Sequence, residues 1–178
     1  MRRFIITGAP GAGKTAIIPQ LELDGVSVVE ESATDVIAVA QARGTAEPWA
    51  DESFIDAVAH LQKARQLRAA KQENDIQFHD RSLICTAALA VYLGYSFPPL
   101  LTSELERINK EAIFERQVFF IRNLGFIAPT EARRISFEQT LRFERIHEET
   151  YRRFGFEFVS VKPASLLERV SIIKAAIA

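Results

Sequence analysis

Residues 8–15 read Gly8-Ala9-Pro10-Gly11-Ala12-Gly13-Lys14-Thr15 and follow directly on a strand-like run at residues 3–7. Glycines at this spacing let backbone N–H groups wrap a phosphate, because glycine permits both the dihedral angles and the close approach that such a loop needs. In this arrangement Lys14 reaches the β- and γ-phosphates, and the Thr15 hydroxyl ligates Mg²⁺. Together with Ala16 at the start of the following helix, the stretch predicts a binding site for ATP and Mg²⁺.

Length and composition favour one ordinary globular domain. The chain has 178 residues, of which 48% are hydrophobic, so we expect a single domain over residues 1–178. Its 22 basic and 23 acidic residues nearly cancel, which makes nucleic acid an unlikely partner on charge alone. The single cysteine, Cys85, has apolar neighbours that predict a buried helix, and it favours a cytoplasmic location. No apolar run is long enough for a membrane span, and we expect no leader sequence.

Apolar runs and helical segments alternate along the chain. This alternation predicts a three-layer α/β/α P-loop fold with a five-stranded parallel sheet. Ser-x-x-Glu or Ser-x-x-Gln patterns that begin at Ser103, Ser136 and Ser165 predict helix starts, and Gly44 and Gly155 predict left-handed helix ends. The strand-like runs are residues 3–7, 26–29, 76–80, 117–121 and 157–161. We also expect a helical insertion at about 32–73, with helices at 32–43 and 53–73, and a lid at about 123–134.

Ligands of such sheets collect at the carboxyl ends of the strands, where two acidic positions stand out. Asp80 closes the third strand, and we expect it to order Mg²⁺ together with Thr15 or to accept the proton of an acceptor hydroxyl; alternatively, Asp80 or Ser82 simply caps the next helix. Glu30 and Glu31 close the second strand. Glu31 is the candidate for holding an acceptor hydroxyl or a magnesium-bound water, whereas the alternative is that both carboxylates favour the start of the next helix through its dipole.

Arginines supply the positive charge that phosphoryl transfer needs. Arg81 follows Asp80 and is placed to meet a phosphate, and Arg134 at the end of the lid is expected to fold onto the γ-phosphate. Arg142 and Arg145, one turn apart on the next helix, either share that task or form ordinary surface ion pairs. Pro163, in the loop after the fifth strand, is expected to pack on the adenine.

These residues resemble a known family of small P-loop ATP-binding proteins, described as AAA-type ATPase or kinase-like. The family is related to the kinase domain of ribosylnicotinamide kinases and to nucleoside and nucleotide kinases. The resemblance covers nearly the whole chain and is carried by residues 4–15, Val28-Val29-Glu30-Glu31, Phe78-His79-Asp80-Arg81, Arg134, His147, Tyr151, Gly155 and Leu167-Glu168-Arg169-Val170. It implies a kinase-like core with the phosphate loop beside the third strand, and roles for Glu31, Asp80 and Arg134. Ser82 departs from the family pattern, in which glycine is common.

Two functions are compatible with this pattern. The first is an ATP- and Mg²⁺-dependent phosphotransferase, a P-loop kinase, that acts on a small nucleoside- or nucleotide-like acceptor through Lys14, Asp80, Glu31 and Arg134. The alternative is an ATP hydrolase or a nucleotide-dependent switch with a protein partner. The acceptor, the oligomeric state and the choice between ATP and GTP stay open at this point.

Overall fold

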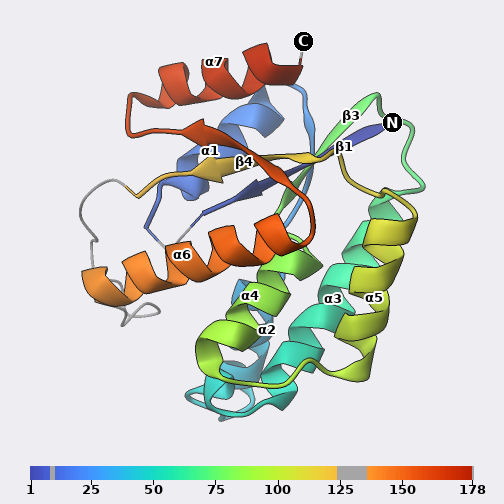
Figure 1. Ribbon diagram of the computed structural model, residues 1–178, viewed down its shortest axis with the longest axis vertical. Helices are drawn as coiled ribbons and strands as arrows, with labels where there is room; N and C mark the ends of the chain where they lie inside the picture. Colours follow the sequence, from blue (N-terminus) through green and yellow to red (C-terminus); the bar gives the residue numbers. More distant parts are fainter. Residues whose placement is uncertain (9–10, 124–135, 178) are drawn as a thin grey trace.

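A five-stranded, fully parallel sheet forms the centre of the protein (Figure 1). The computed structural model describes residues 1–8, 11–123 and 136–177. The strand order is β2-β3-β1-β4-β5, so the strand that leads into the phosphate loop is central and lies beside the third strand, as expected. The strands are β1 (Arg2–Thr7), β2 (Ser27–Val29), β3 (Ile76–Asp80), β4 (Gln117–Ile121) and β5 (Glu157–Val161).

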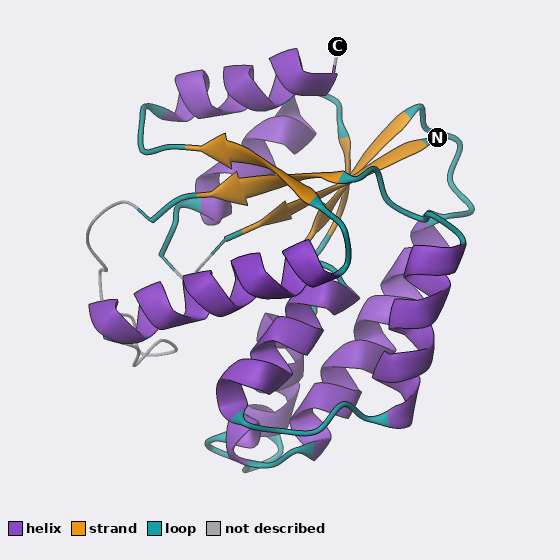
Figure 2. Ribbon diagram, viewed as in Figure 1, coloured by secondary structure: helices purple, strands orange, loops and turns teal. Residues whose placement is uncertain are grey.

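Helices cover both faces of this sheet (Figure 2). They are α1 (Lys14–Leu23), α2 (Ala33–Ala42), α3 (Ser53–Ala69), α4 (Leu83–Leu93), α5 (Pro99–Lys110), α6 (Phe137–Arg153) and α7 (Leu166–Ile177), with a short 3-10 turn at Pro48–Ala50. Within the described part of the chain, no helix is both long and apolar enough to cross a membrane.

Two hydrophobic clusters fill the space between the layers. Neighbouring residues of a strand point to opposite faces, so Phe4 and Ile6 pack with α1 and α7, whereas Ile5 packs with α3, α4 and α5. Phe4, Phe78 and Phe119 from three adjacent strands contact one another with ring centroids 5.6–5.8 Å apart. This buried sheet is a rigid base on which the strand ends are held.

Helix starts agree with the sequence in two cases and differ in one. Ser136 and Gln139 exchange the reciprocal bonds of a capping box at the start of α6, and Ser165 is bonded in the same way before α7. The prediction at Ser103 was wrong, because α5 already begins at Pro99 and the Ser103 hydroxyl donates back to a carbonyl within the helix. Because the ring of proline fixes φ near the helical value, Pro99 favours a helix start before Ser103.

The insertion between β2 and β3 contains the two expected helices, α2 and α3. The second ends at Ala69, four residues before the predicted 73. Gly44 and Gly155 have φ of +95° and +75°, so the left-handed helix ends are confirmed. Nearly all of the expected lid, residues 124–134, lies outside the described residues.

Candidate active site

The phosphate loop begins where β1 meets the neighbouring strand β4. Gly8 has φ +146°, and a Cβ atom at this position would lie 2.4 Å from the carbonyl oxygen of Ile121. Only glycine therefore fits here, both for its backbone angle and for its contact with β4. Gly11 and Gly13 also have positive φ, and Gly13 is the N-cap of α1. The loop thus presents the N-terminus of α1 toward the strand ends, as an anion site requires.

Lys14 is the first residue of α1 and lies among charged groups at the ends of two strands, β3 and β2. Its Nζ donates a hydrogen bond of 3.3 Å to the carbonyl oxygen of Gly8. Its side chain keeps some contact with solvent, but the protein atoms packed around it lower its pKa to about 8, mainly by desolvation and then through the Arg81 guanidinium. The carboxylates of Asp80 and Glu31 act in the opposite direction. The structure therefore brings Lys14 together with Asp80, Glu31 and Arg81, one of the arginines that the sequence offered.

Arg81 turns the chain sharply at the end of β3. Ile6 and Asp80 are paired in the sheet, and the next amide, that of Arg81, donates to the Ile6 carbonyl at 3.0 Å. Arg81 has φ +72°, a conformation that costs a side-chain-bearing residue about 1 kcal/mol. Its Nε lies 3.5 Å from Glu31 Oε1. Burial alone would lower the pKa of Arg81, but Glu31 and other neighbours, including Asp80, raise it overall, so the guanidinium stays charged.

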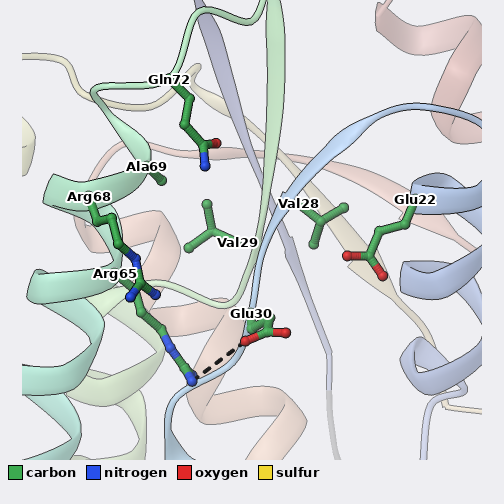
Figure 3. A pocket seen from close by; sticks show the side chains of 8 residues that line it. All are labelled: Glu22, Val28, Val29, Glu30, Arg65, Arg68, Ala69 and Gln72. Carbon is green, nitrogen blue, oxygen red and sulfur yellow. Dashed lines mark ion pairs between the residues drawn. The ribbon is translucent and has the colours of Figure 1, made fainter.

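The two carboxylates at the end of β2 have different surroundings. Glu31 pairs with Arg81 and accepts a 2.6 Å hydrogen bond from the hydroxyl of Thr34 in α2. Glu30 is largely exposed and pairs with Arg65 of α3 at 3.6 Å, beside a separate cavity of about 140 Å³ at the outer edge of β2 (Figure 3). Of this pair, only Glu31 contacts the charged cluster near the phosphate loop. Because Glu31 also contacts Thr34 in the first turn of α2, it can favour the start of this helix as well. A role in the site and a role in helix stability are therefore both compatible with its position.

A buried polar network holds these strand ends in place. Ser82 is the N-cap of α4, and its hydroxyl accepts from the Ile84 amide at 3.2 Å, so the capping alternative is confirmed for Ser82. The Tyr151 hydroxyl of α6 lies 2.9 Å from Ser82 Oγ and 3.0 Å from Cys85 Sγ, which lies 3.1 Å from the Thr7 hydroxyl. Desolvation raises the pKa of Tyr151 well above its usual value, so the phenol stays protonated. The network therefore links α6 and α4 to the residue before the phosphate loop.

Sequence reasoning gave no role to Arg169, which contacts the phosphate loop from α7. The side chain is 4% exposed, and its guanidinium donates a 2.6 Å hydrogen bond to the carbonyl oxygen of Ala12. A signal was present in the sequence: Leu166, Arg169, Val170 and Ile173 follow helical spacing, so an arginine occupies an apolar face.

Several predicted residues are not in contact with this cluster or lie outside the described residues. Ala9, Pro10 and Arg134 belong to the undescribed part of the chain, and their roles stay predictions. Ala16 is exposed in the first turn of α1, and Pro163 is exposed in the loop after β5. A contact of Pro163 with adenine likewise stays a prediction.

The oxygen donors near Lys14 suit Mg²⁺. Thr15 is exposed in the first turn of α1, and Asp80 ends the strand beside β1. Mg²⁺ prefers hard oxygen ligands and commonly takes one or two from the protein, the rest coming from phosphates and water. A hydroxyl and a carboxylate at adjacent element ends are such a pair, so these residues fit the ion.

Comparisons with known proteins agree with the fold. Residues 3–169 match a family described as an AAA domain, and no curated protein matches the chain. Solved structures of deoxyadenosine kinase from M. mycoides are similar. The match to the structure with the products dCMP and a flexible dCDP has a TM-score of 0.64 at 14% identity, and it covers 98% of this chain and 98% of that one. The structure with bound dATP matches with a TM-score of 0.59 at 13% identity, over 98% of this chain and 98% of that one. The structure with bound dCTP matches with a TM-score of 0.59 at 17% identity, over 99% of this chain and 98% of that one. Since the family match includes most of the sequence, this protein belongs to the AAA domain family and has a P-loop kinase fold.

Proposed function

We propose that this protein is an ATP- and Mg²⁺-dependent phosphotransferase that acts on a small nucleoside- or nucleotide-like acceptor. The observation that carries the proposal is the convergence of Lys14, at the start of α1, with Asp80, Arg81 and Glu31 at the ends of β3 and β2. Phosphoryl transfer depends on positioning and charge neutralisation rather than on covalent chemistry by the protein, and this cluster supplies both. The shared fold with kinases whose structures contain deoxynucleotides gives further support.

Each group of the cluster has a role in this proposal. Lys14 and the loop amides bind the β- and γ-phosphates, while Thr15 and Asp80 hold Mg²⁺, which neutralises phosphate charge when bound. The acceptor hydroxyl oxygen attacks the γ-phosphorus, the bond to the β–γ bridging oxygen breaks, and ADP leaves. The hydroxyl proton passes to Asp80 or Glu31. The ion pair with Arg81 keeps the Glu31 carboxylate in place beside the reacting groups.

Two further parts belong to the same proposal. Arg134 closes from the lid and neutralises charge on the γ-phosphate during transfer. Residues 1–178 act as one catalytic domain in the cytoplasm, with Pro163 bordering the adenine.

The test measures ADP release from MgATP with and without a panel of nucleosides, nucleoside monophosphates and other small alcohols. We expect one acceptor class to stimulate release. Slow release that no acceptor changes would instead indicate an ATP hydrolase or a switch.

Variants at two neighbouring strand ends sharpen this test. Asp80→Asn should keep nucleotide affinity within about threefold but lower turnover by roughly 10²-fold or more, because the amide neither accepts the proton nor neutralises Mg²⁺. Glu30→Gln is the matched control, since Glu30 faces Arg65 at the outer edge of β2 and should leave turnover unchanged. Undiminished turnover in Asp80→Asn would remove Asp80 from the mechanism.

A further inference from the structure

We propose that Arg169 of α7 is a positioning residue that orients the peptide between Ala12 and Gly13 so that the Gly13 N–H faces the β-phosphate of a bound nucleotide. The inference rests on the proposed function only in requiring that a nucleotide occupies the phosphate loop. Arg169 itself contacts the loop from the side of α7 and α1, and it acts on the ligand through the peptide group.

The geometry of a peptide bond links the two ends of this arrangement. Arg169 donates its 2.6 Å hydrogen bond to the carbonyl oxygen of Ala12, a residue that is itself buried. No peptide bond among the described residues is cis, and in a trans peptide the C=O and N–H groups point in opposite directions. Because α7 holds the Ala12 carbonyl on its own side, the Gly13 N–H of the same peptide points away from α7. Gly13 is the N-cap of α1, so this N–H belongs to the anion-binding end of that helix.

The charge of Arg169 strengthens the effect. A hydrogen bond from a charged donor polarises the peptide that accepts it, which makes the N–H on the other side a better donor. The guanidinium is buried beside the apolar residues of α7, so little solvent weakens this polarisation. Burial lowers the pKa of Arg169 by desolvation, although an arginine stays protonated in proteins.

The surroundings of Arg169 are poorly suited to a purely structural arginine. Among the residues that the structure describes, no carboxylate lies within ion-pair distance of this side chain, and its buried Nε has no hydrogen-bond partner. Its neighbours along the buried face of α7 are Val170, Ile173 and Ile177, and an apolar side chain would fit there without the desolvation of a charge. Its guanidinium is hydrogen-bonded to the Ala12 carbonyl, so the benefit of arginine at this position would come through the Ala12–Gly13 peptide when nucleotide binds.

The same helix offers a matched control. Arg2 donates a 2.8 Å hydrogen bond to the carbonyl oxygen of Ile177 at the other end of α7. Like the Arg169 bond, this bond runs from an arginine to a backbone carbonyl and involves α7. It joins the C-terminal end of α7 to the start of β1, whereas the phosphate loop follows the other end of β1. Loss of either arginine would therefore remove a hydrogen bond that holds α7, whereas only loss of Arg169 would act on the Ala12–Gly13 peptide.

The experiment compares wild type, Arg169→Met, Arg169→Lys and Arg2→Met. ADP and MgATP affinities are measured by calorimetry, and the unfolding temperature is measured without ligand. We expect Arg169→Met to weaken ADP and MgATP binding by about tenfold or more, the loss typical of one hydrogen bond to a charged group. Its unfolding temperature without ligand should be unchanged or higher, Arg169→Lys should recover part of the affinity, and Arg2→Met should bind as wild type.

The outcomes separate this inference from the proposed function. If wild type binds nucleotide and Arg169→Met binds it equally well, Arg169 has no role in phosphate binding. An equal loss in Arg2→Met, or a loss accompanied by a lower unfolding temperature and no recovery in Arg169→Lys, would also overturn the inference, because it would indicate only a structural contact. A wild type that binds neither ADP nor MgATP would refute the proposed function as well.

Discussion

Raising the pH from 7 to 9 should weaken nucleotide binding about tenfold, because Lys14 loses its proton in this range. Its pKa in the free protein is about 8, lowered from 10.5 mainly by desolvation. The protonated share of Lys14 then falls from about nine-tenths at pH 7 to about one-tenth at pH 9. A lysine with its ordinary pKa would stay almost fully charged over the same range. Since bound phosphates favour the charged form and raise the pKa of Lys14, binding near pH 8 should take up about half a proton.

Calorimetry measures both quantities in one experiment. ADP is titrated into the protein at pH 7, 8 and 9, in pairs of buffers with different ionisation enthalpies, so that proton uptake follows from the difference in heat. Lys14→Arg is the control, because a guanidinium stays charged at pH 9 and should remove the pH dependence whatever its absolute affinity. A wild-type affinity that is constant from pH 7 to 9, or the same slope in Lys14→Arg, would refute the reasoning that a desolvated Lys14 controls binding.

Two further predictions concern the sheet that supports the loop. Gly8→Ala should lower the free energy of unfolding by roughly 2–4 kcal/mol and abolish nucleotide binding, because its Cβ would lie 2.4 Å from the Ile121 carbonyl oxygen. Gly25 also has positive φ but has open space around it, so Gly25→Ala should lower the free energy of unfolding by only about 1 kcal/mol. Equal losses in urea denaturation of the two variants would contradict the clash. His79 is buried and its pKa is lowered to about 3, chiefly by desolvation, so the stability that its neutral form provides is present above pH 6.5 and is lost below it by about 1.4 kcal/mol per pH unit. Urea denaturation of His79→Gln should therefore show a flatter dependence between pH 6.5 and 5 than wild type, whereas the exposed His60→Gln should not.

The sequence predicted those parts of the site that depend on local chemistry and on topology. The positive φ of Gly11 and Gly13 is a property of single residues in a known loop pattern, so the loop could be recognised from spacing alone. Asp80 could be placed because the carboxyl ends of parallel strands meet at one edge of a sheet. Neither inference required a knowledge of side-chain packing.

Features that depend on distant partners could not be read in this way. Glu30 and Glu31 are adjacent in sequence, and their different surroundings come from distant partners, Arg65 for Glu30 and Arg81 for Glu31. The bond from Arg169 joins residues 157 positions apart. A capping pattern can also be present and unused where a stronger local signal competes, as Pro99 does with the pattern at Ser103.

The left-handed turn at Arg81 combines two demands that conflict within a single residue. Glycine would adopt this backbone more cheaply, yet glycine would remove the guanidinium that pairs with Glu31 and acts on Lys14. Selection for a sturdier fold and selection for a working site would thus favour different amino acids at this one position. In the proposed phosphotransferase, arginine at this position therefore accepts about 1 kcal/mol of backbone strain and places a guanidinium beside Lys14.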